Sequence, residues 1–105
     1  MKYKVYYNKG LKMSEGKLAA QVAHITLNIG IEFGIDVEND YRAGGIYPSI
    51  APLDQTIIVL GLSNKKFQEQ LALVEKHEYY HVQKDLGFTE VDEGAITAFG
   101  FIEEF

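Results

Sequence analysis

Residues 2–32, KYKVYYNKGLKMSEGKLAAQVAHITLNIGIE, decide the fold because the spacing of their apolar side chains changes partway along. At the start, aromatic and β-branched residues stand at every second position, which predicts a strand over residues 2–8. After the turn-forming Asn8-Lys9-Gly10, the spacing becomes helical, with Ser14 as a suitable N-cap. The residues at helical spacing are Leu18, Val22, Ile25 and Ile29. They predict a helix from about residue 15 to about residue 32.

Three further strands are predicted over residues 55–60, 78–83 and 95–101. The first of these is a nearly continuous apolar run, so we expect it to be covered on both faces. Ser63 or Asn64 caps a second helix, in which Phe67, Leu71 and Val74 share one face. Because helical segments separate several strands, we expect a single domain over residues 1–105. Its fold would be α/β, with three α/β/α layers and a mixed, largely parallel sheet of about four strands.

Composition excludes several classes of protein. A chain of 105 residues with 47% hydrophobic and 24% charged residues has ordinary globular values. Cysteine is absent from the sequence, so disulfides and thiolate metal sites are excluded, and the three histidines lack the spacing of a metal site. The sequence shows neither a signal-peptide pattern nor an uninterrupted apolar run of bilayer length, so we expect a cytoplasmic protein with no membrane partner.

The net charge of −5 argues against a general nucleic-acid binder. Half of the ten basic residues nevertheless lie within the first 17 positions. A local basic patch there can meet a phosphate, although scattered, solvated lysines explain the same pattern.

Four polar residues of the first predicted helix share one stripe, opposite its apolar face: Lys17, Gln21, His24 and Asn28. Such a stripe is usually the solvated face of an amphipathic helix. A cation, an amide and an imidazole are also the groups that catalytic sites use. His24 has a simpler alternative, a hydrogen bond to a backbone carbonyl in a partly buried place.

Two separated segments resemble the signatures of the type-2 peptidyl-tRNA hydrolases. Residues 11–24, LKMSEGKLAAQVAH, are similar to the family pattern LKMGKGKxAAQxAH, and residues 84–91, KDLGFTEV, followed by Gly94 and Thr97, are similar to DAGxTQxxPGxxT. The sequence departs from the family at Asn8, where an arginine is usual, at Gly10 and at Glu93. These departures put substrate affinity in doubt more than the fold.

The resemblance implies cofactor-free hydrolysis of the ester that joins a peptide to the terminal ribose of tRNA, by direct attack of water. It implies catalytic roles for Lys17, as oxyanion or phosphate partner, for His24, and for Asp85, which would orient His24 or a water. Thr89 would bind that water or the ester carbonyl. It also implies a substrate-binding set comprising Lys12, Gln21, Gly87 and Thr97. The acceptor end of peptidyl-tRNA would be the partner, and the sequence leaves a homodimer open.

Two alternatives stay open. One is a catalytically inactive binding module of the same fold, which recognises a protein or a nucleotide; the other is an unrelated small α/β regulator, in which Lys17 and Asp85 would lie far apart. For the hydrolase, we expect the five residues Lys17, Gln21, His24, Asp85 and Thr89 to converge on one cleft at an end of the sheet. We further expect Lys17 and Asp85 to lie at the cleft rim rather than in the core, with Lys9, Lys12 and Lys17 forming a positive rim.

Overall fold

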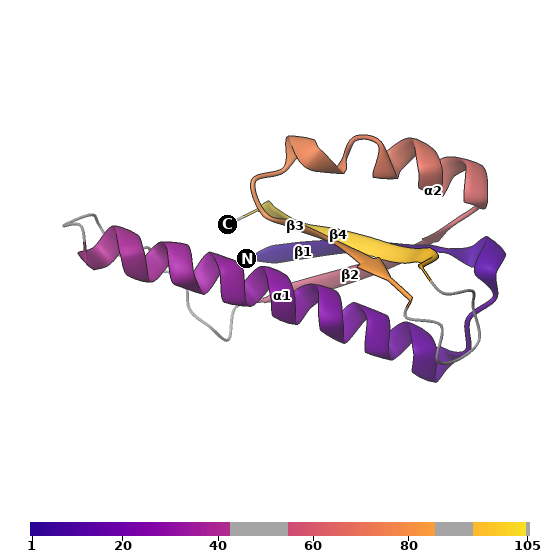
Figure 1. Ribbon diagram of the computed structural model, residues 1–105, viewed down its shortest axis with the longest axis horizontal. Helices are drawn as coiled ribbons and strands as arrows, with labels where there is room; N and C mark the ends of the chain where they lie inside the picture. The colour runs from indigo at the N-terminus through magenta and orange to yellow at the C-terminus, as the bar shows by residue number, and fades with distance from the viewer. Residues whose placement is uncertain (43–54, 86–93, 105) are drawn as a thin grey trace.

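The computed structural model describes residues 1–42, 55–85 and 94–104 as four strands, two α-helices and two short 3-10 helices (Figure 1). In chain order these are β1 (Lys2–Asn8), η1 (Lys9–Leu11), α1 (Glu15–Arg42), β2 (Thr56–Leu62), α2 (Asn64–Leu71), η2 (Val74–Lys76), β3 (Tyr80–Lys84) and β4 (Ile96–Glu104). The predicted alternation of strands and helices is therefore confirmed, with strand boundaries shifted by a few residues.

The four strands form one mixed sheet in the order β2-β1-β4-β3. Only β1 and β2 are parallel, because α1 crosses over between them; β4 runs antiparallel to both β1 and β3. The α/β class with flanking helices is confirmed, but the prediction of a largely parallel sheet is wrong. The physical reason is that a short connection joins β3 to β4, and such a connection suits an antiparallel neighbour.

The two long helices lie on opposite faces of the sheet (Figure 1). On the α1 face, Ile25 and Ile29 are fully buried against Tyr3, Val5, Ala98 and Ile102. Gly100 allows this close packing, since a Cβ there would come within 2.7 Å of Ile25 Cγ2. On the α2 face, Phe67 packs against Phe99 with ring centroids 5.2 Å apart. The first cluster fixes the position of α1, and therefore of its N-terminal turn, relative to the sheet, and the second fixes α2.

Helix α1 continues to Arg42, ten residues beyond the predicted end. Its extension is stabilised by tertiary contacts: Phe33 packs edge-on against Tyr79, and the Tyr79 hydroxyl donates to Asp36 Oδ2 at 2.7 Å. By length and composition alone, Glu15–Asp40 is apolar enough to span a membrane. Within its most apolar window 17% is buried, and Ile25 and Ile29 pack against the sheet.

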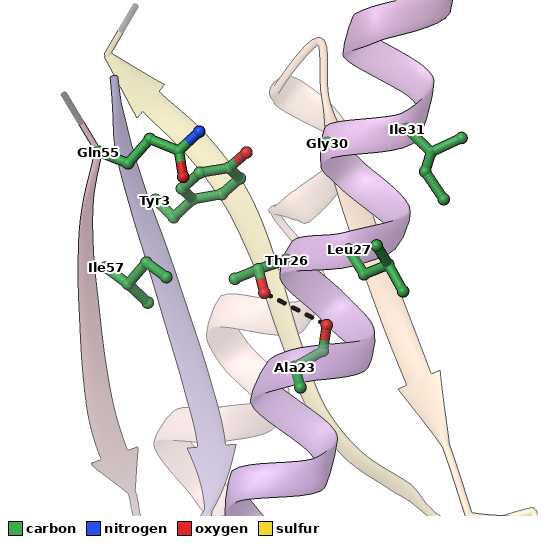
Figure 2. Close-up of a pocket in the computed structure, with 8 residues that line it drawn as sticks. All are labelled: Tyr3, Ala23, Thr26, Leu27, Gly30, Ile31, Gln55 and Ile57. Atoms are coloured by element: carbon green, nitrogen blue, oxygen red, sulfur yellow. Dashed lines mark hydrogen bonds between the residues drawn. The ribbon is translucent and has the colours of Figure 1, made fainter. Parts of the chain in front are cut away.

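Strand β2 is an edge strand, and the prediction that both its faces are covered is wrong. Ile57, Val59 and Leu60 are 47%, 39% and 42% exposed. A continuous apolar run does not distinguish a central strand from an edge strand, because the burial depends on what packs beside it. Between β2 and α1 lies an open cavity of about 550 Å³, lined by residues such as Tyr3, Leu27 and Ile57 (Figure 2).

Candidate active site

The start of α1, the end of β3 and the start of β4 meet at one end of the sheet (Figure 1). Ser14 begins the helix: its hydroxyl accepts from the Lys17 backbone N–H at 3.2 Å, and its carbonyl accepts from Leu18 N–H at 3.0 Å. The predicted N-cap is confirmed, and it places Lys17 in the first helical turn. Because the polar stripe of α1 begins in that turn, its first members face the ends of β3 and β4.

Lys17 and Asp85 form an ion pair between Lys17 Nζ and Asp85 Oδ2. These two residues are 68 positions apart in the sequence, and the structure brings their side chains into contact. The Asp85 side chain is completely buried and that of Lys17 is 12% exposed. The expectation that both groups lie at the rim is therefore wrong. The pair lies beneath the surface, and only the Lys17 side chain is partly exposed to solvent.

The backbone around Asp85 is also fixed. Asp85 N–H donates to the Ala95 carbonyl at 2.8 Å, and Gly94 N–H donates to the Asp85 carbonyl at 2.6 Å. Gly94 has φ of 81°, a left-handed conformation that glycine adopts without steric cost. These two bonds tie the end of β3 to the residues just before β4. The carboxylate is thus held on a defined backbone and meets the helix at a fixed place.

Gln21 and Thr97 form a second buried contact beside the ion pair. The Thr97 hydroxyl lies 3.1 Å from Gln21 Oε1 and 3.3 Å from the Gln83 carbonyl oxygen. Thr97 is the extra residue of a β-bulge, since Gln83 pairs with Ala98 whereas Lys84 pairs with Ile96. A bulge redirects side chains, and here it turns Thr97 toward α1. Gln21 is 5% exposed and Thr97 is fully buried, so this network stiffens the contact between helix and sheet.

The other predicted site residues are placed differently. His24 is exposed on α1, and Asp85 pairs with Lys17 rather than with the imidazole. Lys12 is exposed and adopts the left-handed conformation, with φ of 52°, immediately after η1. Thr89 and Gly87 lie outside the described residues.

Sequence reasoning missed the role of Asn8, which it treated only as a departure from a family pattern. Asn8 is 4% exposed; its side-chain amide donates to Asn64 Oδ1 at 2.8 Å, and its own Oδ1 accepts from Gly10 N–H at 2.9 Å. These bonds join the end of β1 to the start of α2. The only available signal was the Asn-Lys-Gly turn, which does not indicate a partner 56 residues away.

Other parts of the described chain offer less. No three His, Cys, Asp or Glu side chains come together as a possible metal site among residues 1–42, 55–85 and 94–104. The cavity beside β2 is mostly apolar, and the hydroxyl of Thr26 within it already lies close to the carbonyl oxygens of Val22 and Ala23, at 3.0 and 3.2 Å (Figure 2). Compared with this cavity, the Lys17–Asp85 end offers charged groups that can act on a substrate.

The fold and site together define a small α/β protein with a buried lysine–carboxylate pair at one end of a mixed sheet. The family model described as peptidyl-tRNA hydrolase PTH2 matches residues 1–102, and the chain belongs to that family. It is similar to a protein named peptidyl-tRNA hydrolase from Haloquadratum walsbyi, at 31% identity over 98 residues, which cover 92% of this chain and 80% of the relative.

Two further comparisons agree with this assignment. The chain is 33% identical over 95 residues to a probable peptidyl-tRNA hydrolase 2 of Caenorhabditis elegans, covering 89% of this chain but 29% of that protein. It is 30% identical over 98 residues to a peptidyl-tRNA hydrolase of Thermoplasma acidophilum, covering 88% and 75%. The resemblance stated from the two sequence segments is therefore confirmed at the level of the family.

Proposed function

We propose that this chain hydrolyses the ester bond of peptidyl-tRNA by direct attack of water, without a cofactor, and releases free peptide and tRNA. The single observation that carries the proposal is the buried Lys17–Asp85 ion pair, formed by one residue from each of the two signature-like segments. Two segments that are remote in sequence meet in a charge pair at one end of the sheet, which is where open α/β sheets bind ligands. Membership of the peptidyl-tRNA hydrolase family supports the substrate.

The two members of the pair have different roles in this mechanism. Lys17 keeps 12% of its side chain exposed, so its ammonium is the group that reaches the ester carbonyl oxygen. Negative charge develops on that oxygen when water adds, and a compact cation stabilises it. Asp85 is completely buried and holds Lys17 in position. It therefore receives the proton of the attacking water by way of Lys17: the ammonium passes a proton to Asp85 and takes one from the water.

The reaction then completes by cleavage of the bond between the carbonyl carbon and the ribose oxygen. Water adds to the carbonyl carbon, and its proton passes by way of Lys17 to Asp85. The tetrahedral intermediate collapses as the ribose oxygen departs and takes up a proton, and proton exchange with solvent then returns the donor and Asp85 to their starting states. We assign delivery of that proton to His24, which is exposed on α1 three residues beyond Gln21. Thr89 would bind the water through its hydroxyl. Neither Ser nor Cys is required as a nucleophile.

The remaining residues support binding. Gln21 and Thr97 are almost completely buried and contact each other, so we propose that they hold α1 against the bulge and thereby fix Lys17. Lys12 is exposed and available to a phosphate of the acceptor end, and Gly87 would lie close to the substrate backbone. The expected place of action is the cytoplasm.

A single-turnover experiment tests the chemical proposal. Excess purified protein is mixed with N-acetyl-aminoacyl-tRNA, the reaction is quenched over time, and the intact protein mass is recorded beside the amount of released N-acetyl amino acid. Direct water attack predicts product without an acylated protein at any time. An acyl adduct that forms and decays with the product would replace water attack with covalent catalysis. Tight substrate binding by folded protein with no product would favour the inactive binding module.

A further inference from the structure

The first turn of α2 carries two lysines that the candidate site does not use. Lys65 and Lys66 follow Asn64 directly, and both are exposed. Neither has an ion pair in the part of the chain that the structure describes. The helix begins at this point, with the Ser63 hydroxyl accepting from Lys66 N–H at 3.4 Å, so the positive end of the α2 dipole adds to the two charges.

This turn of α2 is fastened to the same end of the sheet as Lys17 and Asp85. The side chains of Asn8 and Asn64 are hydrogen bonded at 2.8 Å, which holds the start of α2 against the end of β1. The Lys9 side chain lies against Gly61 of β2, close to the start of α2. A Cβ added to Gly61 would come within 2.6 Å of Lys9 Cγ. Figure 1 shows the starts of α1 and α2 and the β1–η1 turn together at the right-hand end of the molecule.

Positive charge is concentrated at this end because lysines elsewhere on β1 are neutralised. Lys2 pairs with Glu104 at 3.7 Å, and Lys4 pairs with Glu103 at 3.6 Å, both toward the opposite end of β1. In contrast, five exposed lysines at the candidate-site end have no carboxylate partner within the described residues: Lys9, Lys12, Lys65, Lys66 and Lys84. Of the acidic residues of α1, Glu15 lies in the first turn at this end, whereas Glu32, Asp36, Glu38 and Asp40 lie on the distal half of the helix.

We propose that Lys65 and Lys66, with Lys9 beside them, bind the phosphate backbone of the duplex acceptor stem of tRNA. This inference rests on the proposed function, because the ester at Lys17 determines where the tRNA enters. The lysine surface then receives the backbone as the nucleic acid leaves the site across the β1–η1 turn toward α2. Such contacts are independent of base sequence, which suits an enzyme that must accept many tRNAs. They also explain how a chain with net charge −5 binds a polyanion.

Binding of deacylated tRNA at several salt concentrations tests the surface without requiring catalysis. Each lysine–phosphate contact with a duplex contributes about 0.9 to the slope of log affinity against log salt, so Lys65→Ala/Lys66→Ala should lower the slope by about 1.8. Between about 50 and 200 mM salt, the ratio of wild-type to variant affinity should therefore shrink roughly tenfold. The matched control is Lys2→Ala/Lys4→Ala, which removes two ion-paired lysines from the same sheet and should leave the slope unchanged. Lys65→Arg/Lys66→Arg, which keeps the charges, should retain it.

Two substrates separate this surface from the reacting centre. In Lys65→Ala/Lys66→Ala, kcat/KM should fall by a clearly larger factor for N-acetyl-aminoacyl-tRNA than for the same ester on a trinucleotide CCA. Equal losses on both substrates, or an unchanged salt slope in protein with wild-type circular dichroism, would overturn the proposal. If wild-type protein hydrolyses neither substrate, the proposed function fails, and the salt slope still decides whether this surface binds the duplex.

Discussion

Breaking the Lys17–Asp85 pair should have unequal effects on folding, depending on which partner is removed. Leaving one charge of a buried pair uncompensated typically costs about 3 to 5 kcal/mol of folding free energy. In Asp85→Asn the remaining charge is Lys17, which is 12% exposed and can regain water, so the cost should fall near 3 kcal/mol. In Lys17→Met the remaining charge is a completely buried carboxylate, so the cost should approach 5 kcal/mol.

The double variant Lys17→Met/Asp85→Asn separates stability from catalysis. With both charges gone, no uncompensated ion remains, so the double variant should lose less folding free energy than either single variant, far less than the sum of the two single losses. Activity should not return, because turnover needs both the cation and the carboxylate. We expect kcat to fall by on the order of a hundredfold or more in all three variants, the usual scale for one oxyanion partner or general base.

The measurements are urea unfolding at constant pH for stability and single-turnover hydrolysis at saturating protein for activity, both on protein shown to be folded. Thr26→Ala on the same helix provides a control, because the Thr26 hydroxyl lies within hydrogen-bond distance of two α1 carbonyl oxygens, those of Val22 and Ala23. Additive stability losses would show that the two charges do not depend on each other. Recovery of turnover in the double variant would show that the ion pair is structural, and the mechanism would be refuted.

Three further predictions concern strain, the core and pH. Lys12→Gly should weaken tRNA binding with little change in folding stability. Glycine relieves the left-handed backbone strain at this position, about 1 kcal/mol, and this gain offsets the greater conformational freedom of the unfolded chain. Parallel tRNA-binding and urea titrations check this, and a large loss of stability would contradict it. Phe67→Ala should lower the free energy of unfolding, measured in urea, by roughly 3 to 5 kcal/mol because it leaves a cavity under α2, while the folded molecules stay active. A loss of activity per folded molecule would contradict the separation of core and site. The pKa of Tyr79 is raised from 10.0 to about 12 by burial and by its hydrogen bond to Asp36, so native Tyr79 favours the protonated form. Its contribution to stability is complete below about pH 10 and is lost as the pH rises toward 12. Tyr79→Phe should remove that decline in unfolding experiments between about pH 10 and 12, and an identical decline in the variant would assign it to other groups.

Local periodicity was sufficient to predict β1, the start of α1 and its capping residue. These features depend on neighbours within a few positions: alternation in Tyr3 and Val5, and the Ser14 hydroxyl that accepts from a backbone N–H three residues later. The length of α1 was not predictable in this way. Its extension depends on the contact of Phe33 and Asp36 with Tyr79, more than 40 residues away in the sequence. The exposure of Ile57 on β2 likewise depends on strand order, which the apolar run does not encode.

The candidate site could be predicted as a set of residues but not as a geometry. Lys17 and Asp85 were selected because two separated segments resembled one family, and the structure brings them together. The complete burial of Asp85 and the bulge that turns Thr97 toward Gln21 were not predictable, because both arise where β3, β4 and α1 meet. A sequence pattern states which groups are present; the depth of each below the surface follows only from the packed structure. That depth changes the expected effect of mutations, since Asp85→Asn now affects folding as well as turnover.

The most direct test of the central claim is multiple-turnover release of labelled N-acetyl amino acid from N-acetyl-aminoacyl-tRNA by the purified chain. The account predicts many turnovers per protein molecule and released tRNA that a synthetase can charge again, which shows that the ester and not the RNA was cleaved. The Lys17→Met/Asp85→Asn protein, assayed in parallel, should release about one hundredth as much or less. Wild-type protein that is folded yet releases product only at the spontaneous rate would contradict the claim that this chain is a hydrolase.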